Sequence, residues 1–221
     1  MSHSKSFRRR AALVVLTAFL VIPSFGCAGL LTTLLWLKDG RTHPAEFSDL
    51  EWSKVAVICV RDDSSFGPDR IAETIARRVE RQFEKNIRGV EIIHQDEVVD
   101  WMDNHSWDRI DYRDIGRGLE AEMVVGIDIS DFRTQEGSSL YRGRADVNIT
   151  VYNMEQDGSI AYETDMPNAT FPKTAGIPST ERSADQFRKS FVNALADGIA
   201  RKFYDYDIDA VFATEASIGE L

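Results

Sequence analysis

The chain opens with a long apolar stretch. Ala11–Leu37 is a run of 27 residues without a charged side chain, and Arg8, Arg9 and Arg10 precede it. A helix rises about 1.5 Å per residue, so roughly 20 such residues cross a hydrocarbon core of about 30 Å. The three arginines favour a cytoplasmic amino terminus. We therefore expect residues 1–38 to form a membrane anchor, with the rest of the chain on the extracytoplasmic, periplasmic side.

Two forms of this anchor are consistent with the sequence. Pro23, Gly26 and Gly29 interrupt the apolar run, so Ala11–Ile22 can be the hydrophobic part of a cleaved signal peptide. The pair Gly26-Cys27 resembles a bacterial lipobox, in which Cys27 would be acylated and become the first residue. In the other form the segment is an uncleaved transmembrane helix with Cys27 inside it. The sequence leaves both forms open.

The first part of the domain has the pattern of a strand, a helix and a second strand. We expect residues 39–53 to be a polar tether. Lys54–Val60 is an unbroken apolar run, which predicts a strand buried on both faces in the middle of a sheet. An amphipathic helix follows, with apolar residues every four positions at Ile71, Ile75, Val79 and Phe83. Val90–His94 predicts a second strand, parallel to the first.

The second part of the domain combines short helices with longer strands. We expect Asp96 to cap one short helix and Asp111–Glu120 to form another. Three strands follow, at Met123–Asp131, Tyr141–Val151 and Ile160–Met166. Asp157-Gly158 is typical of a turn between the last two strands.

The last part contains a loop, a helix and a tail. Residues 167–180 include three prolines and predict a long loop. Ser183 and Gln186 form a capping-box pattern at the start of the longest helix, and 207–221 is an acidic tail. The order β-α-β-α-α-β-β-β-α predicts one three-layer α/β (α+β) domain over 54–206, with a mixed five-stranded sheet and flanking helices.

Charge narrows the classes of partner. Five of the 26 basic residues and none of the 36 acidic ones lie in residues 1–38, which leaves 21 basic residues and a net charge of −15 beyond the anchor. Such a domain is repelled by phosphate backbones, so we expect no nucleic-acid partner. Cys27 and Cys59 are the two cysteines of the chain, and no disulfide is expected.

Candidate chemistry is sparse. The sequence contains no recognisable pattern for a nucleophile, a phosphate-binding loop or a zinc site, so we expect no catalytic residue, cofactor or metal. One alternative is a metal-dependent hydrolase that uses Asp62, Asp63, Asp128 and Asp131, which would have to converge within about 5 Å around a cation. Another is a ligand- or lipid-binding component of a transporter, which would need an apolar pocket of about 300 Å³ or more.

Two loops supply candidate partner-binding residues. Trp107 lies in the polar segment between the two short helices, and Pro172 and Pro178 lie in the proline-rich loop. Long loops of this kind often carry binding residues. We therefore predict that Trp107, Pro172 and Pro178 contact a partner.

Several segments together resemble a known group of proteins. They are Lys54–Val60 with its helix, Gln95–Asn104, Ile115–Phe132 (IGRGLEAEMVVGIDISDF) and Tyr141–Tyr162. In pattern and order they resemble the CsgG-like, TolB-amino-terminal-like group of bacterial envelope proteins, which includes LpoB-like lipoproteins. The resemblance implies a membrane-tethered, non-enzymatic adaptor for complex assembly, secretion or wall synthesis. Its partners would be the inner or outer membrane and another envelope protein, with a homo-oligomer left open.

Overall fold

The computed structural model describes residues 42–62, 69–105, 111–209 and 211. The chain divides into two units, one of Met1–Thr42 with Asp207–Asp209 and one of His43–Tyr206 with Ala210–Leu221. The larger unit contains the main sheet and its helices. None of the helices in the described ranges is long and apolar enough to span a membrane. The predicted anchor lies outside these ranges, as does most of the predicted tail.

A mixed sheet forms the centre of the larger unit. Its strands follow the order β3-β2-β4-β5-β6, and a short strand β7 also pairs with β5. The strands are β2 (Lys54–Arg61), β3 (Glu91–Ile93), β4 (Met123–Glu136), β5 (Leu140–Asn153), β6 (Ser159–Phe171) and β7 (Ile177–Pro178). Strand β2 is parallel to β3 and β4, and the remaining pairs are antiparallel. Strands β1 (Thr42–His43) and β8 (Tyr206–Asp207) pair separately.

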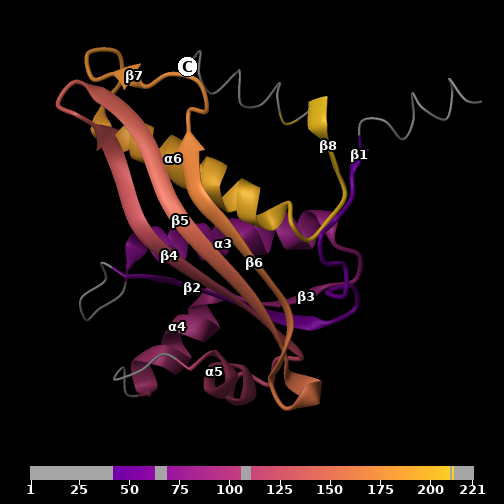
Figure 1. Ribbon diagram of the computed structural model, residues 1–221. Helices are drawn as coiled ribbons and strands as arrows, with labels where there is room; N and C mark the ends of the chain where they lie inside the picture. The colour runs from indigo at the N-terminus through magenta and orange to yellow at the C-terminus, as the bar shows by residue number, and fades with distance from the viewer. Residues whose placement is uncertain (1–41, 63–68, 106–110, 210, 212–221) are drawn as a thin grey trace, which may run out of the picture. The chain divides into compact units, whose positions relative to one another are not determined.

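Helices cover both faces of this sheet (Figure 1). On one face lie α3 (Arg70–Asn86) and α6 (Ala184–Ala200), and on the other lie α4 (Gln95–Asn104) and α5 (Tyr112–Gly118). A short 3-10 helix η2 (Met154–Gln156) leads from β5 toward β6. The predicted three-layer α/β class is therefore confirmed, with the five expected strands and β7 as an additional one.

Strand β2 is buried on both faces, as its unbroken apolar run predicts. Val55 and Val57 belong to the core formed with α3 and α6, whereas Ala56 and Ile58 belong to the core beneath α4 and α5. Successive side chains of a strand point to opposite faces, so a strand between two helical layers needs apolar residues at every position. Leu50, in the predicted tether, is also fully buried in the first core.

Strands β4 and β6 extend beyond their predicted ends because each contains a bulge. Asp131 and Asn168 have positive φ angles of 51°, and the pairing register shifts at both places. A bulge adds one residue to a strand without ending the sheet, and Asn and Asp tolerate positive φ. The backbone N–H of Asn168 donates to Asp146 Oδ1 at 2.6 Å. The predicted loop therefore begins at Pro172 rather than at Pro167.

The helix starts agree in part with the sequence patterns. The predicted capping box of Ser183 and Gln186 is present at α6. At α4 the predicted cap is wrong, because His94 occupies the N-cap position and Asp96 lies in the first turn. The Asp96 carboxylate instead accepts from Arg77 Nη2 at 2.6 Å. Asp157 and Gly158 both have positive φ, in agreement with the predicted turn.

Candidate functional site

Strand β6 forms one edge of the main sheet. It pairs with β5 on one side, so its other side presents backbone groups that β5 does not use. Met166 and Ala169 pack against the core on the α6 side. Glu163 and Asp165 are exposed and pair in register with Thr150 and Asn148 of β5 on the opposite face. The edge strand is thus apolar toward α6 and acidic on its other face.

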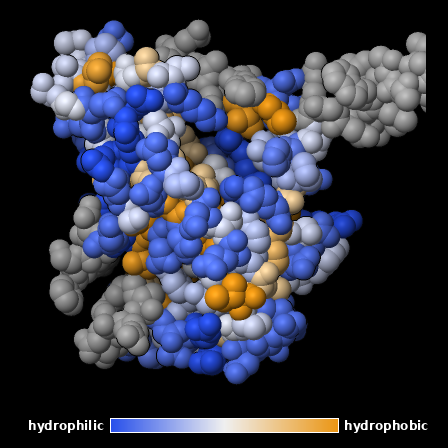
Figure 2. Space-filling view, viewed as in Figure 1, coloured by the Kyte–Doolittle hydropathy of each residue, from blue (hydrophilic) through white to orange (hydrophobic). Residues whose placement is uncertain are grey.

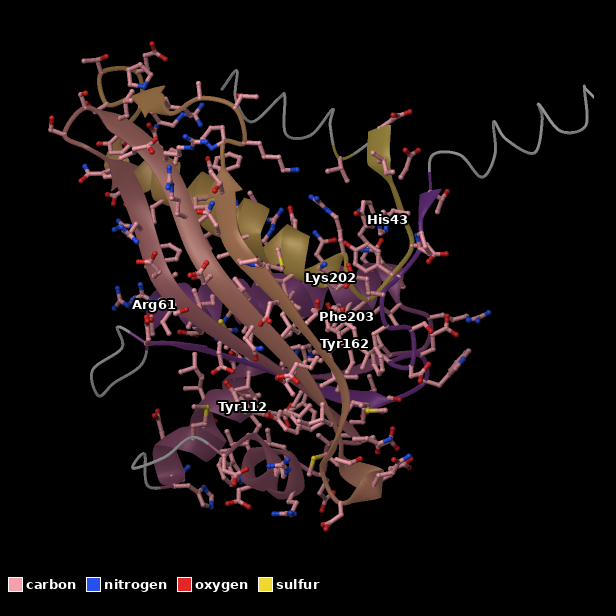
Figure 3. The ribbon with its side chains drawn as sticks, viewed as in Figure 1. His43, Arg61, Tyr112, Tyr162, Lys202 and Phe203 are labelled. Carbon is pink, nitrogen blue, oxygen red and sulfur yellow. The ribbon has the colours of Figure 1, made fainter. Side chains whose placement is uncertain are left out.

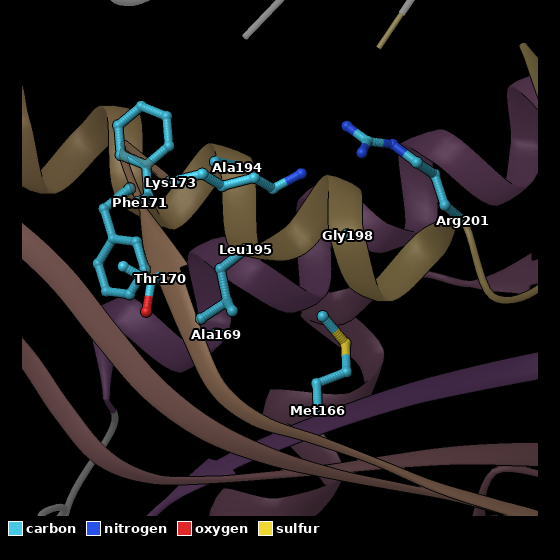
Figure 4. A pocket seen from close by; sticks show the side chains of 10 residues that line it. Met166, Ala169, Thr170, Phe171, Lys173, Ala194, Leu195, Gly198 and Arg201 are labelled. Atoms are coloured by element: carbon cyan, nitrogen blue, oxygen red, sulfur yellow. The ribbon is translucent and has the colours of Figure 1, made fainter. Parts of the chain in front are cut away.

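A groove lies between this edge strand and α6 (Figure 4). We call it the β6–α6 groove. The residues that line it are Met166, Ala169, Thr170, Phe171, Lys173, Phe191, Ala194, Leu195, Gly198 and Arg201. Its volume is about 170 Å³. An apolar cavity of about 150 Å³ holds a benzene molecule, so the groove has room for one large apolar side chain.

Small residues on α6 keep the groove open. Ala194 and Gly198 stand one turn apart on the helix and both face the groove. A Cβ atom added to Gly198 would lie 3.3 Å from Met166 Cε. Glycine inside a helix is about 1 kcal/mol less favourable than alanine. Its presence at position 198 therefore makes room at the cost of helix stability.

The mouth of the groove is basic. Figure 4 shows the charged ends of Lys173 and Arg201 extending over the groove from opposite sides. The Arg201 guanidinium also lies 5.8 Å from the ring of Tyr206. Among the described residues that line the groove there is no carboxylate. Two basic side chains therefore border the groove in a chain whose net charge is −10.

Nearer the start of β6, a polar and aromatic cluster covers the same side of the strand (Figure 3). The Tyr162 hydroxyl donates to Glu46 Oε2 at 2.7 Å, and Lys202 Nζ donates to Glu46 Oε1 at 2.5 Å. The Lys202 bond lowers the pKa of Glu46, and burial raises the pKa of Tyr162 to about 12. Phe47 stacks on Tyr162 with ring centroids 5.3 Å apart. This cluster leaves the later part of β6 to form the groove.

The structure places one of the predicted partner-binding residues beside the groove. Pro172 follows a cis peptide bond from Phe171, and Lys173 comes next, so two lining residues flank it. Pro178 lies in β7 and pairs with Leu140 of β5. Trp107 and the predicted lipid-attachment residue Cys27 lie outside the described residues.

The carboxylates of the hydrolase alternative have separate partners. Asp128 Oδ1 accepts from the Tyr112 hydroxyl at 2.6 Å, and Asp131 forms an ion pair with Arg133. Burial, followed by the nearby Asp128 carboxylate, raises the pKa of Tyr112. Over the described residues, no three His, Cys, Asp or Glu side chains come together as metal ligands. Asp62 and the other described carboxylates therefore do not support that alternative, and Asp63 lies outside the described part.

Cys59 of β2 has the surroundings of an unreactive thiol. It packs against the buried core of the sheet, and burial raises the pKa of its thiol. A thiol with a raised pKa stays protonated at neutral pH and is a poor nucleophile.

The ligand-binding alternative needs a larger apolar space than the β6–α6 groove. A second hollow, between the first turns of α3 and α6, has a volume of about 330 Å³. Its lining includes the cations Arg70, Arg188 and Lys189 together with Asp185. The β6–α6 groove is apolar but too small for a lipid or a drug-sized molecule. The second hollow is larger but strongly charged.

Comparisons with known proteins give distant structural similarity. No protein-family model matches the sequence, and no curated protein matches it. Similar solved structures include a PelC dodecamer from Paraburkholderia phytofirmans, with a TM-score of 0.45, 11% identity, and coverage of 74% of this chain and 96% of that chain. Lipoprotein GNA1162 from Neisseria meningitidis has a TM-score of 0.41 and 10% identity, with coverage of 67% and 98%.

The C-terminal domain of LpoB from Salmonella enterica is a further similar structure. Its TM-score is 0.36 and its identity 15%, with coverage of 52% of this chain and 82% of that chain. These structures include lipoproteins of the kind that the sequence resembles, but they give no support to CsgG in particular. Scores at this level describe a distant likeness of fold.

The sequence patterns did not identify the groove residues. Met166 and Ala169 follow the alternation of an ordinary strand, and Leu195 follows the periodicity of an ordinary core helix. The one local signal was Gly198, a glycine inside a strongly helical pattern, which often has a packing or functional reason. Lys173 lies in the loop that was predicted to bind a partner, next to the predicted Pro172.

Proposed function

We propose that this chain is a membrane-anchored, non-enzymatic adaptor of the bacterial envelope. In this proposal the apolar run Ala11–Leu37 anchors the chain, and the domain binds another envelope protein on the extracytoplasmic side. The observation that carries the proposal is the sheet edge β6, which lies next to a groove that fits one large side chain. Strand addition to a sheet edge and insertion into a hydrophobic groove are two recurring ways in which proteins bind peptide segments.

The size and surroundings of the groove favour a protein partner. Small-molecule sites enclose about 300 to 1,000 Å³, and this groove holds about 170 Å³. Figure 2 shows that the apolar surface on the displayed face forms small patches within a largely hydrophilic surface. A large apolar patch would be needed for a broad obligate interface. A side chain inserted into a local groove suits a smaller, segment-based contact.

The edge strand also limits how a partner can bind. Pro167 has no N–H group, and the bulge at Asn168 shifts the register of β6. Proline and bulges protect edges against uncontrolled strand addition. After the bulge, Ala169–Phe171 remain as a short edge beside the groove. Specificity would therefore come mainly from the inserted side chain.

Site-specific photo-crosslinking tests this proposal. A photoreactive amino acid replaces Lys173, which is exposed at the mouth of the groove, in the full-length chain, and a matched variant carries it at Lys85, which is exposed on α3. Both variants are irradiated in native membranes. We expect position 173 to give a discrete protein adduct that position 85 does not give. Equal adduct patterns from the two positions would contradict a binding role for the groove.

A further inference from the structure

We propose that the hollow between the first turns of α3 and α6 is a binding site for a phosphate monoester group. We call it the α3–α6 hollow. Arg70, Arg188 and Lys189 line it and hold the phosphate oxygens. The inference goes beyond the adaptor function and does not depend on it, because this hollow and the β6–α6 groove share no described lining residue.

Packing between two helices creates the hollow. Helices α3 and α6 lie side by side on one face of the sheet (Figure 1). Arg78 of α3 donates from Nε and Nη2 to the two carboxylate oxygens of Asp197 on α6, at 2.7 Å each. Arg70 and Lys189 each lie about two helical turns before this ion pair, on α3 and α6 respectively. The first turns of the two helices therefore come together around a space of about 330 Å³.

The charge of the hollow is opposite to that of the chain. Its lining contains three cations and one carboxylate, a formal charge of +2, whereas the chain has a net charge of −10. Arg188 forms an ion pair with the carboxylate of Asp185. Arg70 and Lys189 form no ion pair within the described ranges of the chain. Like charges in one hollow repel each other, and a bound anion offsets this repulsion.

The amount of charge favours a phosphate monoester over other anions. A phosphate monoester carries about −1.5 to −2 charges at neutral pH and has three terminal oxygens. The guanidinium groups of Arg70 and Arg188 present paired N–H donors that match phosphate oxygens, and Lys189 adds a point charge. A carboxylate or a phosphodiester carries one charge and compensates half of the excess. Physiological salt screens charges beyond about 8 Å, so the local cations dominate in the hollow.

Side chains rather than helix ends bind the phosphate. The Asp69 carboxylate accepts from the N–H of Ile71 at 2.8 Å, and Ser183 Oγ accepts from the N–H of Gln186 at 3.3 Å, so both helix starts are already capped. Ile71 and Val192 add apolar surface to the hollow. Its volume lies at the lower end of the range of about 300 to 1,000 Å³ for small-molecule sites. It therefore has room for a phosphate and a small group attached to it.

Phosphorus-31 NMR of the full-length chain in a neutral detergent tests this site. Inorganic phosphate and dimethyl phosphate are added together at about pH 8, where the first is mostly a dianion and the second a monoanion. Each gives its own signal, which broadens when the ion binds the slowly tumbling protein. We expect the phosphate signal to broaden at least about fivefold more, because phosphate matches the charge of the hollow. Equal broadening of the two signals would overturn the inference.

Charge variants locate the bound phosphate. Arg70→Gln with Lys189→Gln removes both cations that lack an ion pair, and we expect phosphate binding to weaken at least about tenfold. The matched control, Arg81→Gln with Lys85→Gln, removes the same charge from exposed positions of α3 outside the hollow. The control should keep binding within about twofold. Equal losses in the two variants would show attraction to net charge alone and would overturn the site.

Two further variants keep this test decisive. Arg70→Lys with Lys189→Arg conserves the charge and should keep binding within about threefold. Thermal melting in detergent checks that each variant is folded. If the double glutamine variant does not fold, Lys189→Gln alone takes its place, and binding at least about threefold weaker is expected. Unchanged binding in a folded variant that lacks these charges would overturn the inference.

Two competitors identify the source of the phosphate group. Glycerol 3-phosphate is a soluble monoester, and dihexanoyl phosphatidic acid presents the same group on a lipid. We expect each to sharpen the inorganic phosphate signal again by displacing the ion. Stronger displacement by the lipid supports a headgroup as the ligand, and equal displacement supports a soluble ligand. Displacement by neither would show an adventitious ion only, which overturns this site and leaves the adaptor function to its own crosslinking test.

Discussion

A buried carboxyl group makes the stability of the domain depend on pH. Glu80 of α3 is 5% exposed, and its Oε1 accepts from Gln95 Nε2 at 3.3 Å. Gln95 Nε2 also donates to the Val57 carbonyl at 3.0 Å. Burial raises the pKa of Glu80 from 4.5 to about 7. Between these values the folded state holds a proton that the unfolded state releases, so stability falls as pH rises through this range.

Replacement of the Glu80 carboxyl group should remove its contribution to the pH dependence of stability. We expect Glu80→Gln to flatten the change in the free energy of unfolding between about pH 5 and about pH 8, where Glu80 contributes a loss of roughly 3 kcal/mol or less. Urea unfolding of the full-length chain in detergent at several pH values measures it. Glu84→Gln, at an exposed position of the same helix, is the control. Parallel pH profiles for the parent and Glu80→Gln would refute the explanation.

Two glycines near the groove should respond differently to alanine. A Cβ on Gly198 would meet the flexible end of Met166 at 3.3 Å, whereas a Cβ on Gly143 of β5 would lie 2.4 Å from Phe191 Cγ. We expect Gly198→Ala to raise the free energy of unfolding by up to about 1 kcal/mol through helix propensity. Gly143→Ala should lower it by about 1 to 3 kcal/mol through overpacking. Denaturant unfolding measures the free energy of unfolding of both variants. A large decrease for Gly198→Ala would contradict the geometry of the groove.

At the scale of elements, the bulge in β6 holds one wall of the groove in place. Asn168 has a φ of 51° and donates its N–H to Asp146. A β-branched residue is strained at this φ, whereas glycine is not. We expect Asn168→Val to lower the free energy of unfolding by about 1 to 3 kcal/mol and Asn168→Gly to change it much less. Unfolding curves provide the comparison, and equal losses for the two variants would show that the backbone conformation is not the cause.

The helices and strands also show which features of the fold could be predicted from local sequence patterns. The apolar run of β2, the four-residue spacing in α3 and the capping box of α6 each depend on local residues, and each prediction was confirmed. The ends of β4 and β6 depend on bulges, in which a single residue changes the register and breaks the alternation. At the start of α4, Asp96 does not cap the helix and accepts a hydrogen bond from Arg77 of another helix. These tertiary effects have no local signature.

The groove was not predictable because its walls come from distant segments. Lys173 and Arg201 are separated by the whole of α6, and their placement over one space depends on how that helix packs against β6. The predicted loop residues gave a partial indication, since Pro172 lies between two lining residues. The predicted roles of Trp107, Pro172, Pro178 and Cys27 remain predictions.

At the scale of the whole chain, we expect a separable domain. The described core of the larger unit extends from Leu50 to Phe203. Removal of Ala11–Leu37 should therefore give a folded protein that needs no detergent, because the apolar run is the part that favours lipid. Size-exclusion chromatography and circular dichroism measure this. An aggregated or unfolded product would contradict a domain that folds apart from its anchor.

The most direct test of the proposed binding site measures partner contact with the β6–α6 groove open and with the groove filled. A photoreactive residue at Lys173, which is exposed at the mouth of the groove, reports contact, and Gly198→Leu places a side chain inside the groove. We expect a protein adduct from position 173 in native membranes and its loss when Gly198→Leu is present in a chain that still melts cooperatively. An adduct of equal yield in the filled groove would show that the partner binds elsewhere.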